Sequence, residues 1–531
     1  MRSPFSSAAR TLLALGFALG LGGLVDGCSL KNVSHDSCSS DTQCATAFGG
    51  GSKCQEGYCT DPVMCTTGHD CRKQAGGGAC VNGMCTLDFP TNPNCDAITE
   101  PPDVLKQKAT GSNAPLLIGG IFSLAGAHDL ALTKAARLAV QEINANGGLN
   151  NGQQVGIVFC DNGGSNDMAT KDQRLSLDDG AIDYLAGTLG VPYIVGPLTS
   201  ADSVELINEL KRKSLPTVVI SPSATSPDLT EADDRLHKND PYGLFWRTCP
   251  SDLLQGQIIA KNLVAPDSTI THLSVIYIDD SYGGGLASVV SSTYGSTKTK
   301  LFPYKDPDTI GDPTALDAFV TQVLQDPSQA VLMISVKGAA SVTLLKAMVA
   351  KDSTVKNRQF FFTDGSEDAD LLAAAGGTDD VATILKAARG TAPAPPDASN
   401  VAFQVFATNL QSAFKLDATS ASFLAQTYDA TYVGAYGVVY ASKNGSNYDG
   451  LDVAAGMAHL SSGTAVTVGP NSWNTARGAL NNKGTIDITG ISGPLNFDAS
   501  TGEAPGAVQE WSIDTSGASP SYSQVQIFLP Q

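Results

Sequence analysis

The stretch that decides the fold is residues 194–230, IVGPLTSADSVELINELKRKSLPTVVISPSATSPDLT. A first apolar run ends at Gly196. After it, apolar residues recur at helical spacing at Val204, Ile207 and Leu210, and residues 217–220 form a second apolar run. This order predicts strand, helix and strand. The same alternation extends back to Leu116, and it predicts a parallel sheet with right-handed crossovers.

Two polar turns follow these strands, Leu198-Thr199-Ser200 and Ser223-Ala224-Thr225. Ligands of open parallel sheets bind beyond the carboxyl ends of the strands, where these turns should lie. Ser200 opens a helix, so its hydroxyl and the free N–H groups behind it can accept an anion. The alternative is that Ser200 and Thr225 only cap and turn the chain. The occurrence of both at one sheet edge favours a binding site.

The bulk composition limits the possible functions. The chain has 531 residues, of which 42% are hydrophobic, with a formal net charge of −19 and a pI of about 4.6. The length predicts two or three domains. The negative charge argues against nucleic acid as a partner, because such proteins usually carry a basic face.

The first residues indicate export. Residues 11–24, TLLALGFALGLGGL, are apolar but too short to span a membrane, so 1–27 is predicted to be a signal peptide. The following Leu24-Val25-Asp26-Gly27-Cys28 resembles a bacterial lipobox, which implies cleavage before Cys28 and a diacylglycerol on its thiol. We therefore predict that the mature protein is anchored by lipid at the periplasmic face of a bacterial membrane or at the cell surface. The alternative is an ordinary signal peptide with Cys28 in a disulfide.

Eight cysteines form two copies of one pattern within a predicted Cys-rich module, residues 28–95. The copies are Cys38, Cys44, Cys54 and Cys59, followed by Cys65, Cys71, Cys80 and Cys85. Each copy is too small for a hydrophobic core, so we expect these cysteines to form disulfides in an exported protein. Zinc is the alternative, but the Cys-x2-Cys spacing typical of zinc sites is missing. The module resembles those at the front of some bacterial surface lipoproteins, which implies a spacer or a protein contact.

Three cysteines remain, Cys95, Cys160 and Cys249. If Cys28 carries lipid, the remaining number is odd and at least one thiol is unpaired unless a partner chain intervenes. A catalytic cysteine is the sharper alternative, but none of the three stands in a recognisable motif with His, so we expect structural cysteines. Residues 86–113 have few periodic apolar positions, and we predict a linker over 96–114.

A second series of helices and strands begins near residue 250. Its predicted strands include Leu273 to Ile278, followed by Asp279-Asp280-Ser281-Tyr282, and Gln359 to Phe362, followed by Thr363-Asp364-Gly365. Two α/β lobes with crossings between them predict a cleft that closes on a ligand.

The body resembles the type I periplasmic binding proteins, especially the leucine/isoleucine/valine-binding branch. The resemblance rests on an ordered set of segments over about residues 115–515, including VGPLTSADS, VVISPSATSPDLT, FWRTCPSDLLQGQ, VIYIDDSYGGGLA, FFFTDGSED and QTYDATYVGAYGVVYA. It implies an α/β fold of two Rossmann-like lobes joined by three hinge strands. Lobe I would be 115–249 plus 391–492, and lobe II would be 250–390 plus 493–531. The crossings would fall near Arg247–Pro250, Ile384–Thr391 and Gly493–Asp498.

The resemblance also implies a site for a small zwitterion. Ser200 and Thr225 would hold a carboxylate, and the Ser223-Ala224 turn would offer a carbonyl to the ammonium. Asp364 would face the ammonium, with Tyr282 completing the box when lobe II closes. Lys337 and His128 depart from the family pattern and would shift preference toward a more polar or acidic ligand. Thr199 stands where the family's lobe I disulfide would have its second cysteine, so that disulfide should be absent.

The resemblance therefore implies a lipoprotein that captures an amino acid or similar molecule and delivers it to an ABC permease, without cofactor or metal. A ligand-sensing surface receptor built on the same lobes is the alternative. An enzyme ranks third, because the chain lacks a Gly-x-Ser-x-Gly elbow, a phosphate-binding Gly-x4-Gly-Lys loop and a His-Glu-x2-His motif.

Overall fold

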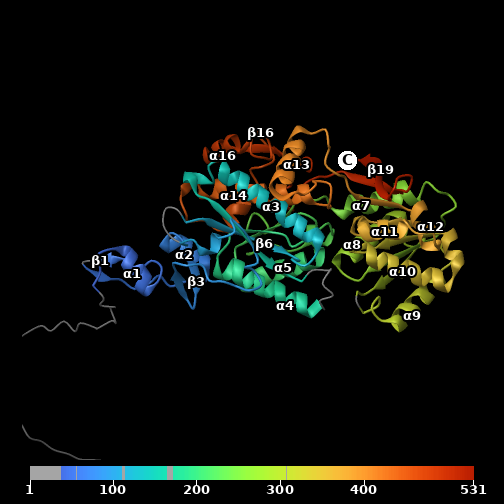
Figure 1. The fold of residues 1–531 in the computed structure, drawn as a ribbon, viewed down its shortest axis with the longest axis horizontal. Helices are drawn as coiled ribbons and strands as arrows, with labels where there is room; N and C mark the ends of the chain where they lie inside the picture. The colour runs from blue at the N-terminus through green and yellow to red at the C-terminus, as the bar shows by residue number, and fades with distance from the viewer. Residues whose placement is uncertain (1–36, 56, 110–113, 164–170, 307, 531) are drawn as a thin grey trace, which may run out of the picture.

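The computed structural model describes residues 37–55, 57–109, 114–163, 171–306 and 308–530. Two α/β lobes lie side by side along the long axis, and the Cys-rich module extends from the end of the first lobe (Figure 1). The predicted signal peptide and Cys28 lie outside the described residues.

The first lobe is built on a six-stranded sheet with the order β10-β9-β8-β6-β7-β5. The strands are β5 (Ile98–Glu100), β6 (Leu116–Phe122), β7 (Val155–Asp161), β8 (Tyr193–Val195), β9 (Val218–Ser221) and β10 (Phe245–Arg247). All neighbours pair in parallel except β5, which runs antiparallel to β7. The lobe's first helices are α3 (Ala127–Ala145), α4 (Lys171–Ile182), α5 (Ser200–Lys213) and α6 (Asp228–Glu231). Continuous apolar strands such as β6, buried at every residue, are typical of a sheet covered on both faces.

The second lobe is built on a seven-stranded sheet with the order β12-β11-β13-β14-β15-β18-β19. Its strands are β11 (Leu273–Ile278), β12 (Thr299–Tyr304), β13 (Ala330–Ile334), β14 (Gln359–Phe362), β15 (Arg389–Pro393), β18 (Val508–Asp514) and β19 (Ser521–Phe528). Its helices are α7 (Asp252–Ile258), α8 (Ser281–Tyr294), α9 (Pro313–Leu324), α10 (Gly338–Lys351), α11 (Ala369–Ala375) and α12 (Asp380–Ala387). The parallel part ends at β15, and β18 and β19 add an antiparallel edge.

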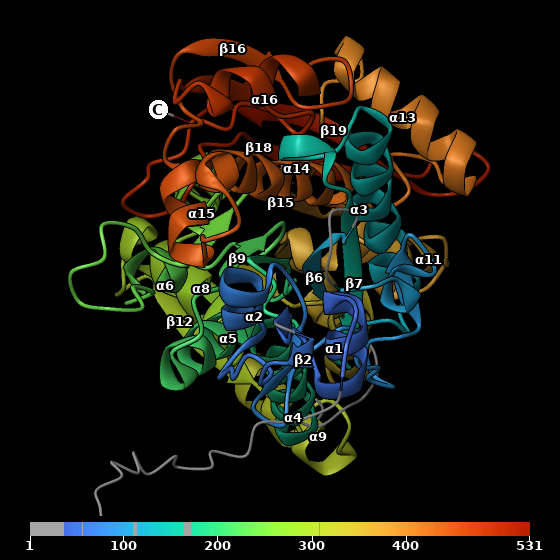
Figure 2. The same ribbon diagram turned by 90° about the vertical axis from the view of Figure 1, so that its left-hand side faces the viewer.

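The chain returns to the first lobe between β15 and β18. This part comprises α13 (Val401–Phe414), α14 (Leu424–Ala441), α15 (Gly450–Met457), α16 (Trp473–Asn481), β16 (Thr464–Thr467) and β17 (Ile486–Thr489). These elements lie over the first sheet in Figure 2. Nearly all of α14 is buried, and its tyrosines Tyr428, Tyr432 and Tyr436 pack in sequence, the last stacked on Trp473. The two stretches of chain therefore share one core.

The linker prediction is wrong for residues 96–109. β5 pairs with β7, Cys95 and Cys160 form a disulfide, and Val104 is fully buried in a core cluster of the first lobe. This segment therefore belongs to the lobe. A strand of three residues is too short to give a periodic apolar pattern, which is why the sequence read as a linker.

The second and third crossings lie further along the chain than expected. Residues 391–393 still pair in the second sheet, and Leu495 and Phe497 still pack in the core of the first lobe. The second crossing therefore follows Pro393, and the third lies between Ala504, in the first core, and Val508, in the second. Short hinge segments carry no period of their own, so the sequence located them only approximately.

The Cys-rich module contains two similar disulfide-linked units. Repeat 1 has α1 (Asp41–Phe48), β1 (Cys54–Gln55) and β2 (Tyr58–Cys59), and repeat 2 has α2 (Gly68–Ala75), β3 (Ala79–Val81) and β4 (Met84–Thr86). The disulfides are Cys38–Cys54, Cys44–Cys59, Cys65–Cys80 and Cys71–Cys85, so each repeat pairs its first cysteine with its third and its second with its fourth. The prediction of disulfides is confirmed.

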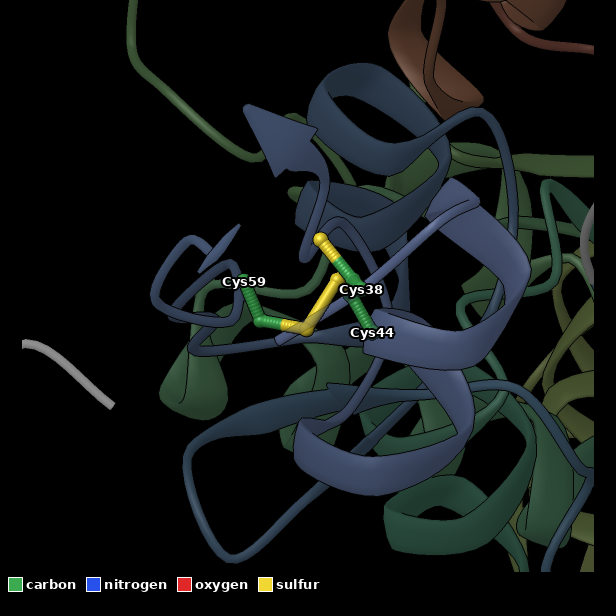
Figure 3. Close-up of side chains that lie close together, drawn as sticks. All are labelled: Cys38, Cys44 and Cys59. Atoms are coloured by element: carbon green, nitrogen blue, oxygen red, sulfur yellow. A yellow bond between two sulfur atoms is a disulfide. The ribbon is translucent and has the colours of Figure 1, made fainter. Parts of the chain in front are cut away.

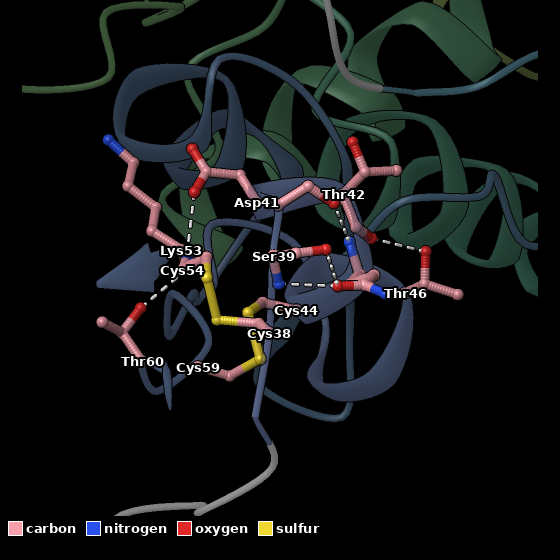
Figure 4. The surroundings of a disulfide bond; sticks show 12 residues. Cys38, Ser39, Asp41, Thr42, Cys44, Thr46, Lys53, Cys54, Cys59 and Thr60 are labelled. Atoms are coloured by element: carbon pink, nitrogen blue, oxygen red, sulfur yellow. Dashed lines mark hydrogen bonds between the residues drawn. A yellow bond between two sulfur atoms is a disulfide. The ribbon is translucent and has the colours of Figure 1, made fainter. Parts of the chain in front are cut away.

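The sulfur atoms of each repeat lie close enough to suggest a metal site. Cys38, Cys44 and Cys59 converge in Figure 3, with their sulfurs within 4.8 Å of one another. The proximity arises because two disulfides pack together, and sulfur in a disulfide is not a thiolate ligand. In Figure 4, the Asp41 carboxylate accepts a hydrogen bond from the Cys54 N–H at 2.8 Å, which ties α1 to β1. The zinc alternative therefore does not hold for these cysteines.

Repeat 2 is fixed to the first lobe by Arg72. This buried guanidinium donates to the carbonyls of Gly190 at 2.7 Å and Tyr448 at 3.1 Å, and it lies over the Tyr448 ring. The backbones touch directly, since a Cβ on Gly68 would lie 2.4 Å from the Thr188 carbonyl oxygen. Repeat 2 therefore sits on the first lobe at the end away from the second lobe (Figure 1).

Candidate functional site

A cavity of about 190 Å³ lies between the two lobes. Its wall includes six of the residues predicted from sequence, namely Thr199, Ser200, Ser223, Thr225, Tyr282 and Asp364. The first four come from the turns after β8 and β9 and the start of α5, and the last two from the start of α8 and the end of β14. Both sheets therefore present their carboxyl ends to one space, as expected for parallel sheets.

The hydroxyl side chains on the cavity wall of the first lobe also make hydrogen bonds within the protein. The Thr199 hydroxyl caps α5 by accepting from the Asp202 N–H at 3.1 Å, and the Ser200 hydroxyl accepts from the Ser226 N–H at 3.1 Å. The Ser223 hydroxyl donates to the Leu198 carbonyl at 2.8 Å. Ser200 thus keeps its own hydroxyl hydrogen for another acceptor.

Ala224 does not have the predicted role. It is fully buried outside the cavity wall, and its carbonyl accepts from the Arg247 guanidinium at 3.0 Å and lies 3.5 Å from the Cys249 thiol. Its carbonyl is therefore used to hold the first crossing. The sequence pattern did not separate the two residues of this turn, because only the fold decides which of them faces inward.

The wall of the second lobe is centred on Asp364. One oxygen of its carboxylate accepts from the Tyr282 hydroxyl at 2.9 Å and from the Gln255 side chain at 2.8 Å. The Tyr282 hydroxyl oxygen also lies 2.8 Å from the Thr363 hydroxyl, from which it can accept while its own hydrogen is donated to Asp364. These contacts fix the direction of the carboxylate before any ligand arrives, which reduces the ordering cost of binding.

A second buried carboxylate, Asp252, was missed by the sequence analysis. It accepts from the Thr225 hydroxyl at 2.8 Å and is fully buried at the start of α7. Burial, together with the nearby Asp364, raises the pKa of Asp252 well above its ordinary value, and burial raises the pKa of Asp364. The nearby Arg247 charge acts in the opposite direction on the pKa of Asp252, but the guanidinium pairs with Glu503. An Asp in the first turn of a helix reads as an ordinary helix-dipole partner, so no sequence pattern marks this pair.

The departures His128 and Lys337 also line the cavity, but both already pair with carboxylates. His128 Nδ1 lies 2.9 Å from Asp129, and the Lys337 ammonium lies 2.9 Å from Asp306. Asp129, Asp202, Glu367 and Asp368 add further carboxylates to the wall. The expected shift toward an acidic ligand therefore has no support in the charges around the cavity.

Cys249 is the cysteine left outside a disulfide among the described residues. It is fully buried beside the first crossing, and burial raises the pKa of its thiol to about 12. A thiol with this pKa is not a nucleophile at neutral pH. The alternative of a catalytic cysteine therefore fails here, and Cys95 and Cys160 are joined to each other.

Comparison with known proteins identifies the family. A family model described as a receptor family ligand binding region matches residues 131–511. The chain belongs to this family. The predicted type I periplasmic binding fold and the prediction of a binding protein instead of an enzyme are both confirmed. Among the described residues, none of the helices combines the length and apolarity that crossing a membrane requires.

Curated relatives in this ligand-binding family match part of the chain. The chemotactic signal transduction system substrate-binding protein BasB of Halobacterium salinarum is 25% identical over 237 residues, which is 43% of this chain and 51% of the relative. The leucine-, isoleucine-, valine-, threonine- and alanine-binding protein of Pseudomonas aeruginosa is 25% identical over 168 residues, 31% of this chain and 39% of the relative. The chain thus spans about half or less of the length of these relatives.

Solved structures share the ligand-binding family's fold. The branched-chain amino acid transporter substrate-binding protein LivJ of Streptococcus pneumoniae, in complex with isoleucine, has a TM-score of 0.52 at 18% identity and covers 77% of this chain and 100% of its own. A solute-binding protein of R. palustris in complex with 4-hydroxybenzoate has a TM-score of 0.56 at 12% identity, over 78% of this chain and 98% of its own. At these identities the likeness establishes the fold alone.

Proposed function

We propose that the protein captures an amino acid or similar small zwitterion in the cavity between its lobes. The observation that carries this proposal is the placement of Ser200 and Asp364 on opposite walls of one cavity, each wall from a different lobe. A carboxylate would meet the hydroxyl of Ser200 and the start of α5, where helix N–H groups favour negative charge. An ammonium would meet Asp364.

The Thr225 hydroxyl can donate a hydrogen bond to the ligand if Asp252 is protonated. In that state Asp252 donates to the Thr225 hydroxyl oxygen, and the hydroxyl hydrogen of Thr225 becomes available to the ligand. The raised pKa of Asp252 favours this state. The ligand would bind first to the wall of the first lobe, and Tyr282 and Asp364 would reach it when the second lobe closes.

A thermal-shift screen tests the proposed ligand class. Bound ligand stabilises the folded state by mass action, by about 2.7 kcal/mol at one hundred times the Kd. We therefore expect at least one of the twenty amino acids to raise the Tm of the purified protein. If none does so at millimolar concentration, the proposal of an amino-acid ligand is wrong.

We also propose that the protein is exported and anchored through Cys28. The support is the lipobox-like sequence around Cys28 and the disulfide-linked module, because disulfides persist outside the cytoplasm. Mass spectrometry of protein from membranes should find an N-terminal peptide that begins with a diacylglyceryl Cys28. A mature chain that begins elsewhere with an unmodified Cys28 would rule out the anchor.

An ABC permease is the proposed partner for delivery, and a sensory receptor is the second candidate. The similarity to a chemotactic substrate-binding protein favours the sensory role, as does repeat 1, which projects beyond repeat 2 (Figure 1). Loss of the protein should abolish uptake of labelled ligand if it serves a permease. Unchanged uptake with a lost behavioural response to the same ligand would favour the sensor.

A further inference from the structure

A second and larger cavity adjoins the first at the hinge. It measures about 560 Å³ and lies between elements of both lobes, with walls from α13 and the start of α14 on one side and β15, β18 and β19 on the other. Figure 1 shows α13 and β19 on the two sides of this junction. The volume falls in the range of small-molecule sites, whereas the first cavity is smaller than that range.

The two cavities share a wall. Asp364, Glu367, Ser422 and Phe423 line both of them. Phe423 directly precedes α14 and has φ of +65°, a left-handed conformation that a bulky residue rarely adopts. Such conformations persist where the surrounding structure imposes them, and they are frequent at ligand clamps. Because the half-buried Phe423 lines both cavities, it lies at the boundary between them.

The hinge cavity has an apolar wall with a few amide groups. Its apolar lining includes Pro393, Pro396, Phe403, Ala421 and Ile527. Gln426 also lines it and is 6% exposed. A mostly apolar wall that includes a side-chain amide suits an apolar side chain attached to a peptide group.

The shared wall also carries more carboxyl groups than the single ammonium of an amino acid can pair with. An amino acid has one ammonium, but Asp364 and Glu367 both face the boundary. Glu367 accepts from the Gln509 side chain at 3.2 Å. Burial and the nearby Asp364 raise the pKa of Glu367 to about 8, so this carboxyl group favours the protonated form until a cation lies beside it. A second nitrogen beyond the first would supply one.

We propose that the ligand is a short peptide with a free amino terminus, most simply an apolar dipeptide, which occupies both cavities past Phe423. This inference rests on the proposed function, since it keeps the carboxylate at Ser200. The peptide N–H then lies at Asp364, the terminal ammonium at Glu367, and the first side chain in the hinge cavity with its carbonyl toward Gln426. A dipeptide extends from the nitrogen end, which is where the two cavities meet.

Calorimetry with L-leucine and L-leucyl-L-leucine tests the proposal on the purified protein. We expect the dipeptide to bind at least tenfold more tightly than leucine. Ala421→Trp, which fills the hinge cavity from a loop, should reduce this ratio to about one. Ala318→Trp, on the exposed face of α9, is the matched control and should keep the ratio.

Glu367→Gln should lower the affinity for the dipeptide at least tenfold, and N-acetyl-leucine, which has no ammonium, should bind no better than leucine.

The outcomes separate this inference from the proposed function. If leucine binds and the dipeptide binds no more tightly, the two-cavity ligand is wrong while the amino-acid site stands. If Ala421→Trp leaves the ratio intact, the hinge cavity does not hold the ligand, and the inference is overturned. If neither compound nor any other amino acid binds, the proposed function falls as well.

Discussion

Replacing Asp364 with asparagine is expected to weaken binding of an amino acid about 30-fold or more. Truncation of one partner in a buried, hydrogen-bonded charge pair costs about 2 to 5 kcal/mol, and each 1.4 kcal/mol is about tenfold in Kd. Asparagine keeps the shape and can still accept from Tyr282 and Gln255, so the loss would report the missing charge. Calorimetry measures the change in Kd. Asp317→Asn, on the exposed side of α9, changes the net charge equally and should leave affinity unchanged.

The same substitution should not destabilise the ligand-free protein. Burial raises the pKa of Asp364 above its unfolded value, so ionisation of this group is less favourable in the folded state than in the unfolded state. The contribution of Asp364 to the unfolding free energy of the wild type therefore falls as pH rises above the unfolded pKa of about 4. Asp364→Asn removes this dependence, and the Tm of the variant at pH 8 should equal or exceed that of the wild type. A variant that loses both affinity and Tm would indicate a structural role for Asp364 instead.

Replacing Arg247 with methionine is expected to lower the unfolding free energy by about 3 to 5 kcal/mol, as for other buried ion pairs that lose one partner. Arg247 is fully buried and donates to the carbonyls of Ala224 at 3.0 Å and Ser226 at 2.8 Å. It also pairs with Glu503, next to the third crossing. The variant removes the guanidinium from two carbonyls and from the Glu503 carboxylate, which keeps the neutral Thr230 hydroxyl as a side-chain donor, and denaturant unfolding measures the cost.

Lys356 provides the control for this prediction. It also pairs with a carboxylate, that of Asp380, but the two side chains are 40% and 33% exposed, so Lys356→Met should cost less than about 1 kcal/mol. If Arg247→Met costs no more than Lys356→Met, the tie between the first and third crossings does not contribute to stability.

Long periodic segments made most of the fold predictable. Strands such as β6 and β11 are continuous apolar runs, and α5 shows helical spacing, so the two α/β lobes could be read from the sequence. The duplicated cysteine spacing identified the disulfide module, but spacing does not determine which cysteines pair. The three-residue β5 and the Cys95–Cys160 disulfide depend on contacts between distant residues. No local pattern could have revealed them.

The candidate site was predictable to the level of turns. Polar residues after parallel strands mark the edge where ligands bind, and six of the seven proposed residues line one cavity. Which side chain of a turn faces inward depends on the fold, so Ala224 could not be separated from Ser223. Asp252 and Glu367 were missed because their importance comes from burial beside Asp364, and burial of a charged residue has no signature in the sequence.

The attachment of repeat 2 through Arg72 has a mechanical consequence. Repeat 2 is tied to the first lobe, so a rotation of the second lobe that narrows the cleft would also move it relative to repeat 2. The largest displacement relative to repeat 2 would then occur at the far end of the second lobe (Figure 1). A reporter pair placed on α2 and α9 would therefore register occupancy of the cleft as a change in their separation.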